Sequence, residues 1–179
     1  MVSRFTDLSI FSDSPHRAPN HVLINEYQPG QGIMRHEDGA AYYPVVATVS
    51  LGAPIILDVF EKRKNDEEPQ ESHQSLQLGQ EIGPATAAAA IAPQYRILQE
   101  RRSLLVTTGR LYTDFLHGIA DRETDKDLGA ESVCNWELLG NQDEFSGGSY
   151  ERHTRISLTY RDVLKVSKVG NIVKFLGSS

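Results

Sequence analysis

The chain has 179 residues, of which 39% are hydrophobic and 23% are charged, and its formal net charge is −6. This length suits one domain over residues 1–179, large enough to bury a core without disulfides. The single cysteine, Cys134, excludes an intramolecular disulfide and a cysteine-rich zinc site. No apolar run reaches the roughly 20 residues of a membrane helix, so we expect no membrane association. The negative charge argues against strong non-specific binding to nucleic acid.

Short runs rich in Val, Ile, Leu, Thr and Tyr alternate with Gly and Pro turns along most of the chain. They predict strands at 21–27, 32–34, 45–51, 55–60, 103–108, 111–119 and 155–166. Many short strands separated by turns are typical of a β-sandwich or a barrel of the jelly-roll type. The sequence therefore predicts a mainly β protein with little helix.

Two stretches, 61–102 and 121–151, interrupt this rhythm, and we interpret both as long inserts between strands. The first opens with a run of mixed charge that has no apolar periodicity, which is typical of a loop. It continues into an alanine-rich run between Pro84 and Pro93, for which a short helix and a loop remain equal alternatives. In the second insert, Trp136 is the residue expected to anchor the loop to the core.

His36 and Asp38 are candidate metal ligands, because residues two apart in an extended segment share a face. His117, on a later predicted strand, is the favoured third ligand. Two histidines and one carboxylate on one face of an octahedron are typical of non-haem Fe(II) sites. His153 is a rival ligand, although its arginine neighbours would repel a cation. The alternative is that His36 is a solvated loop residue and His117 a hydrogen-bonded strand residue.

Arg155 and Arg161 form a second candidate site, because their spacing places both on one face of a strand. Inside a barrel they would require anions, and a small dicarboxylate could satisfy one guanidinium through a bidentate salt bridge. The alternative is two surface arginines on an edge strand. Asn25 and Tyr27 also share a face and offer hydrogen bonds to a carboxylate.

These motifs occur together, and in the same order, in the AlkB family of Fe(II)- and 2-oxoglutarate-dependent dioxygenases. The shared pattern is N-x-Y at 25–27, P-G at 29–30, H-x-D at 36–38, H-G-I at 117–119 and R-x-x-L-T-x-R at 155–161. The chain resembles this family over about residues 20–60 and 100–166. The resemblance implies a double-stranded β-helix, a cupin-like jelly-roll barrel with the iron at its open end.

The resemblance also implies the residues that hold each cofactor. His36, Asp38 and His117 would bind Fe(II) and form the catalytic centre. The residues implied for 2-oxoglutarate are Arg155 and Tyr27 at its distal carboxylate, Asn25 and Arg161 near its chelating end, and Ser157 on the same inward face. The co-substrates are 2-oxoglutarate and O₂. Together with the lack of a signal peptide, the resemblance implies a cytoplasmic or nuclear location.

The implied reaction is oxidative dealkylation of alkylated bases in DNA or RNA. There are two alternatives. One is a dioxygenase that acts on a protein or a small molecule, and the other is a weakly active barrel that binds nucleic acid. In the bacterial member of the family a second acidic residue follows the metal-binding Asp, where this chain has Ala40. A nucleotide-gripping lid lies upstream of N-x-Y in that protein, and we do not expect a full lid in the short segment before Asn25. No oligomeric state is predicted.

The first insert is the candidate replacement for such a lid. Its basic residues could follow a phosphate path, and the alternative is plain solvated charge; these residues are Lys62, Arg63, Lys64, Arg101 and Arg102. Tyr42 and Tyr43, just after the metal motif, could stack on a flipped base. Packing under the rim of the barrel is the alternative role for both tyrosines.

Overall fold

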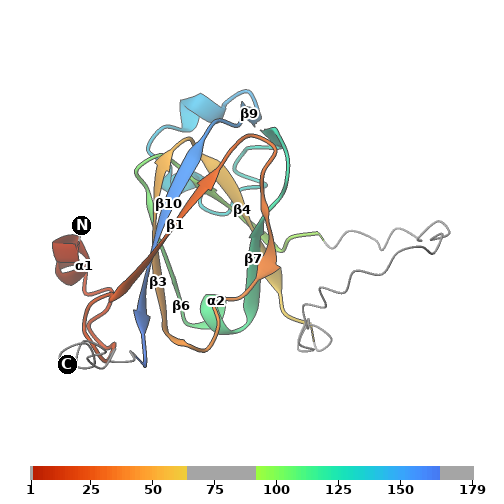
Figure 1. Ribbon diagram of the computed structural model, residues 1–179. Helices are drawn as coiled ribbons and strands as arrows, with labels where there is room; N and C mark the ends of the chain where they lie inside the picture. The colour runs from red at the N-terminus through yellow and green to blue at the C-terminus, as the bar shows by residue number, and fades with distance from the viewer. Residues whose placement is uncertain (1, 64–91, 166–179) are drawn as a thin grey trace, which may run out of the picture.

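The computed structural model describes residues 2–63 and 92–165, in which β-strands predominate (Figure 1). The first elements are α1 (Val2–Asp7), β1 (His21–Tyr27), β2 (Ile33–His36), β3 (Tyr42–Gly52) and β4 (Ile55–Glu61). The next are β5 (Tyr95–Gln99), β6 (Leu104–Thr108), α2 (Arg110–Thr113) and β7 (Phe115–Ile119). The last are β8 (Thr124–Lys126), the 3₁₀ helices η2 (Trp136–Leu138) and η3 (Gln142–Phe145), β9 (Ser149–Glu151) and β10 (Arg155–Val163). No helix in the described ranges is long and apolar enough to cross a membrane.

Two antiparallel sheets form the body of the molecule. The first has the strand order β1-β10-β3-β6 and the second β2-β7-β4-β5, while β8 and β9 form a separate pair. Figure 1 shows β1, β3 and β10 on one side and β4 and β7 on the other. A cavity lies between the sheets and is lined by side chains from both of them. The prediction of a mainly β jelly-roll is confirmed.

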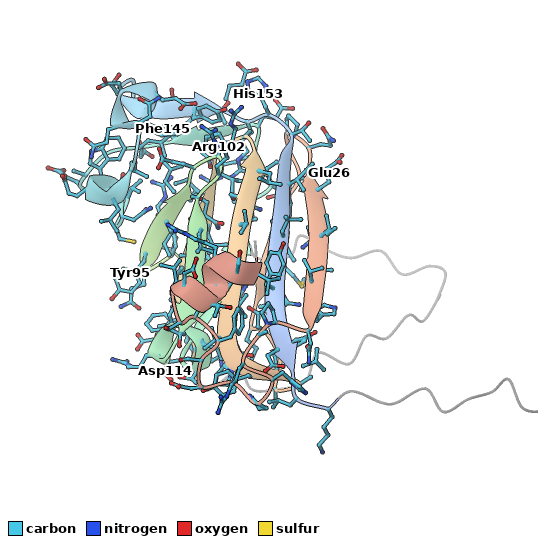
Figure 2. The ribbon with its side chains drawn as sticks, turned by 90° about the vertical axis from the view of Figure 1, so that its left-hand side faces the viewer. Glu26, Tyr95, Arg102, Asp114, Phe145 and His153 are labelled. Carbon is cyan, nitrogen blue, oxygen red and sulfur yellow. The ribbon has the colours of Figure 1, made fainter. Side chains whose placement is uncertain are left out.

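Strand β10 shows how the sequence determines which side chains reach the interior. From Arg155 to Arg161 its residues alternate between buried and half-buried positions, and the buried ones are polar: Arg155, Ser157, Thr159 and Arg161. The apolar residues between them face outward, where Leu158 and Tyr160 pack against Phe5 and Phe11 of the N-terminal segment. Figure 2 shows α1 lying across this outer face. The period of two is therefore kept as far as Arg161, with the polar face inward and the apolar face covered.

The second predicted insert is built onto the free edge of the second sheet. The Asn135 side chain accepts a hydrogen bond from the Leu98 N–H and donates one to the Leu98 carbonyl oxygen, both at 2.9 Å. These two bonds occupy the outer edge of β5. Beneath it, Leu98 packs with Ile56, Val133 and Phe145, and Trp136 lies against this cluster as the sequence predicted. A covered edge cannot pair with another chain, so this segment protects the sheet as well as extending it.

The structure differs from the predicted elements in several places. The single strand expected over 111–119 is the short helix α2 followed by β7, because the chain turns after Gly109. The segment 61–102 contains strand β5, and 121–151 contains the β8–β9 pair. The last strand ends at Val163 rather than at residue 166. The alanine-rich run, Lys64 and most of the first insert lie outside the described residues.

Candidate active site

The three predicted metal ligands come together at the meeting of β2 and β7. These strands are antiparallel partners with His36 opposite His117, and the centroids of the two imidazole rings are 4.5 Å apart. Asp38 follows β2, and its Oδ2 atom lies 3.8 Å from Nε2 of His117. The close approach of the strands depends on Gly118, whose missing Cβ would lie 3.0 Å from backbone atoms of β2.

The donor atoms of this group fit a metal such as Fe(II). Nδ1 of His36 lies 2.8 Å from the carbonyl oxygen of Met34, so that contact leaves Nε2 as the free donor atom. Burial lowers the pKa of His117 to about 4, which keeps the imidazole neutral. Within residues 2–63 and 92–165, no three His, Cys, Asp or Glu side chains are already arranged as the ligands of a metal ion.

Asp38 is held by its neighbours on two sides. The guanidinium of Arg161 forms an ion pair with Oδ1 and also lies over the ring of Tyr42, 4.8 Å from its centroid. The Tyr112 hydroxyl, from α2, donates to the Asp38 carbonyl oxygen at 2.8 Å and approaches that of Gly39 at 3.2 Å. Arg161 Nε is buried and has no hydrogen-bond partner in the described parts of the chain. That unused donor points to a further anion beside the metal ligands.

Arg155 lies at the other end of the inward face of β10 and is only 2% exposed. Its Nε donates to Ser50 Oγ at 3.0 Å, and its Nη2 donates to Gln99 Oε1 at 2.9 Å. The ring of Tyr27 lies 5.5 Å from its guanidinium carbon. Burial lowers the pKa of Arg155 to about 10, so it remains a cation at neutral pH. A buried cation among neutral groups attracts an anion.

The two ends belong to one cavity of about 90 Å³ between the sheets. Its polar lining includes every residue predicted for the metal and the co-substrate: Asn25, Tyr27, His36, Asp38, His117, Arg155, Ser157 and Arg161. Aliphatic side chains of the strands complete the wall. A narrow cavity with a His–Asp–His group at one end and a buried arginine at the other suits a metal and an elongated anion.

Two residues that bond to Arg155 were not found by sequence reasoning, and one of them, Gln99, lines the cavity. Ser50 and Gln99 are both buried, and they reach Arg155 from β3 and β5. For Ser50 a signal exists, because Thr48 and Ser50 are polar residues two apart in an apolar strand. For Gln99 the signal is a single polar residue at the end of the run Y-R-I-L-Q.

The structure also decides several alternatives. His153 lines a different hollow, with Arg101 and Arg102, and Figure 2 shows His153 and Arg102 at the end of the molecule opposite Asp114. His153 is therefore not placed to replace His117 as the third metal ligand. The interpretation of the arginines as surface residues of an edge strand is wrong, because β10 lies between β1 and β3.

The predicted phosphate path and stacking residues are placed as follows. Lys62 pairs with Glu37 and donates to the carbonyl oxygen of Thr113. Its ammonium group is therefore bonded within the protein, which argues against a role in binding phosphate. Arg101 and Arg102 lie away from the cavity with the metal ligands. Tyr42 packs on Arg161, which favours its packing role over free stacking.

Comparison with known proteins agrees with this geometry. The profile of the 2OG-Fe(II) oxygenase superfamily matches residues 4–161. A zebrafish (Danio rerio) protein named probable RNA/DNA demethylase ALKBH6 is 35% identical over 152 residues, which cover 84% of this chain and 56% of that protein. A Xenopus tropicalis protein named tRNA (carboxymethyluridine(34)-5-O)-methyltransferase alkbh8 is 29% identical over 146 residues, 81% of this chain and 18% of its own length.

An uncharacterised protein, L905, of Acanthamoeba polyphaga mimivirus is 27% identical over 157 residues, 87% of this chain and 54% of its own. The chain thus spans at most about half the length of these relatives. The match to the superfamily nevertheless extends from the N-terminal segment to the end of the arginine motif on β10. The relatives confirm the resemblance to AlkB proteins, and the chain belongs to the 2OG-Fe(II) oxygenase superfamily, whose members use Fe(II), 2-oxoglutarate and O₂.

Proposed function

We propose that this protein is an Fe(II)- and 2-oxoglutarate-dependent dioxygenase that removes alkyl groups from nucleic-acid bases. The observation that carries the proposal is the buried Arg155, which has no ionic partner among residues 2–63 and 92–165, at one end of a cavity whose other end holds His36, Asp38 and His117. That arrangement matches a molecule with a carboxylate at one end and a metal-chelating group at the other. Membership of the superfamily supports the same chemistry.

In this proposal His36, Asp38 and His117 hold the iron, which supplies the redox chemistry that activates O₂. Arg155 orients the distal carboxylate of 2-oxoglutarate through a charge-assisted hydrogen bond. Arg161 forms an ion pair with the Asp38 carboxylate and so helps to hold it at the cavity wall. The aliphatic wall excludes water from the reacting groups. Its members are Leu23, Ile33, Val46, Leu57, Leu105 and Ile119.

The substrate class is proposed from the relatives and not from the cavity. The zebrafish relative is named a probable RNA/DNA demethylase, and the frog relative is named for tRNA. Alkylated RNA or DNA is therefore the first substrate to test. The net charge of −6 predicts that binding depends on a local surface and not on the overall field of the protein.

Cofactor binding is tested by adding Fe(II) and 2-oxoglutarate without oxygen to the wild type and to His36→Ala. A visible charge-transfer band is expected in the wild type alone, because the variant lacks one of three protein ligands. A matched control is His153→Ala, which lies in another hollow and should keep the band. A band of equal intensity in His36→Ala would refute the metal-site assignment.

The substrate is tested by measuring succinate and aldehyde release with N-methylated single-stranded RNA and DNA oligonucleotides. Unmethylated oligonucleotides of the same sequence are the control. The proposal expects succinate and aldehyde in equal amounts with at least one methylated oligonucleotide. Succinate without aldehyde from any oligonucleotide would mean that the cofactor chemistry is right and the nucleic-acid substrate wrong.

A further inference from the structure

Gln99 joins the two sheets at the end of the cavity that holds Arg155. It lies on β5 of the second sheet, whereas Ser50 and Arg155 lie on β3 and β10 of the first. All three side chains are almost fully buried, with 3%, 0% and 2% of their surface exposed. A buried glutamine is costly unless its polar atoms are bonded, so its contacts have structural or functional significance.

These three side chains form a closed set of hydrogen bonds with consistent directions. Arg155 Nε donates to Ser50 Oγ, whose own proton is then free to donate to Gln99 Oε1 at 3.4 Å. Gln99 Oε1 also accepts from Arg155 Nη2 at 2.9 Å. Both bonds require the glutamine to present its oxygen, which fixes the orientation of the amide. The guanidinium is thereby held at two nitrogens; in the described part of the chain no other hydrogen bond of this side chain is formed, so its remaining N–H groups are open to a ligand in the cavity.

The partners of Arg155 are also all uncharged. They are the Ser50 hydroxyl, the Gln99 amide and the ring of Tyr27, and no acidic side chain of the described residues forms an ion pair with it. An amide acceptor orients a guanidinium without neutralising it. A carboxylate at the same position would do both, and would remove the reason for an anion to enter.

We propose that Gln99 is a positioning residue that makes this end of the cavity select a carboxylate, by orienting Arg155 and leaving its charge uncompensated. The inference rests on the proposed function, because it assigns Arg155 to the distal carboxylate of 2-oxoglutarate. It adds a residue on a strand that none of the motifs in the sequence includes.

Gln99→Glu tests this directly, because the change keeps the side-chain shape and adds one negative charge beside Arg155. The KM for 2-oxoglutarate is expected to rise at least about tenfold, which corresponds to the loss of one charge-assisted hydrogen bond. The kcat at saturating 2-oxoglutarate should change much less, since the metal ligands lie at the other end of the cavity. Gln94→Glu, at an exposed position just before β5, is the matched control and should keep the wild-type KM.

Binding and stability are measured alongside kinetics, with Mn(II) in place of Fe(II) and 2-oxoglutarate as the probe. Gln99→Glu should melt no lower than the wild type without 2-oxoglutarate, because the new carboxylate pairs with Arg155. It should lose most of the rise in melting temperature that 2-oxoglutarate gives the wild type. Gln99→Met removes the acceptor without adding charge, and it decides the matter if Gln99→Glu fails to fold. That variant should raise KM by a smaller factor than Gln99→Glu.

The outcomes separate the inference from the proposed function. If Arg155→Ala loses 2-oxoglutarate binding while both Gln99 variants bind as tightly as the wild type, the inference is wrong and the proposed function stands. If the wild type and Arg155→Ala both fail to bind 2-oxoglutarate, the proposed function is wrong and the inference falls with it. The inference is supported if the Gln99 variants raise the KM for 2-oxoglutarate with a nearly unchanged kcat while Gln94→Glu keeps the wild-type KM.

Discussion

At the scale of single residues, Asp38 and Arg161 each supply the opposite charge that the other needs. Both side chains are largely buried, and their ion pair joins a predicted metal ligand to a predicted co-substrate residue. Breaking a buried ion pair on one side leaves an uncompensated charge, which costs more than the pair itself contributes. A cation bound at Asp38 would compensate the carboxylate charge in place of Arg161. A bound metal should therefore reduce the loss of stability that follows when Arg161 is removed.

Arg161→Ala is therefore expected to lower the free energy of unfolding by about 3 kcal/mol without metal. With Mn(II) at saturation the loss should be clearly smaller, as measured by urea unfolding of both proteins in both conditions. Arg110→Ala is the matched control, because its pair with Asp114 is exposed at the protein surface. An equal loss for Arg161→Ala with and without Mn(II) would show that Asp38 does not face the metal.

At the scale of elements, the N-terminal segment is fastened to the end of β10 by paired polar contacts. Asp162 is buried and accepts from the backbone N–H of His16 at 3.1 Å, and its other oxygen lies 2.6 Å from Nδ1 of His16. Asn20 exchanges two hydrogen bonds with the backbone of Val163. Phe5 and Phe11 complete the attachment by packing on the outer face of the sheet. The segment is thus part of the fold's covered core.

Asp162→Ala is expected to destabilise the protein by about 1–3 kcal/mol, because His16 loses a buried, charged hydrogen-bond acceptor. Burial acts to raise the pKa of Asp162, but hydrogen bonds from His16 and Ser14 hold it below its ordinary value. Its contribution is therefore present above the pKa of the unfolded state and is lost as the pH falls through the lower folded value. Unfolding measured between pH 7 and pH 3 should show a weaker acid dependence in the variant. Parallel pH curves would contradict this assignment.

At the scale of the whole molecule, the barrel is complete without residues 64–91. Strands β4 and β5 are direct partners, with Val59 opposite Tyr95, and Gln94 N donates to the Val59 carbonyl at 2.8 Å. The two ends that flank the long connection are therefore already close together. Lys62 must be kept, because it bonds to Glu37 between the metal ligands and to Thr113.

Replacing residues 64–91 with a short Gly/Ser linker is expected to leave Fe(II) and 2-oxoglutarate affinity within about twofold of the wild type, because loop length alone changes the closure entropy little. Calorimetric titration of the Mn(II)-loaded protein with 2-oxoglutarate measures this. Extending the deletion to Lys62 should weaken metal binding. Loss of 2-oxoglutarate binding in the shorter deletion would show that the connection contributes to the site.

The sequence predicted the barrel, and it named the residues that the structure brings to one cavity. It could do so because His36, Asp38, Arg155 and Arg161 lie in short motifs that occur in the same order in the AlkB family, and the alternation within each motif places its members on one face. Gln99 could not be found in this way, since its role depends on which strand of the opposite sheet lies against Arg155. The same holds for β5, whose pairing with β4 spans a long connection that carries no strand signal.

The order of residues along β10 links two regions of the molecule. Arg161 faces inward to Asp38, while the next residue, Asp162, faces the N-terminal segment on the outer side. One peptide unit thus separates the attachment point, Asp162, from Arg161, whose side chain pairs with the carboxylate proposed to hold iron. A substitution at His16 or Asn20, on the outside of the sheet, is therefore expected to weaken this attachment and also to disturb Arg161 and, through it, Asp38. Screens for damaging variants in this protein should include the outer surface of β10 as well as its cavity.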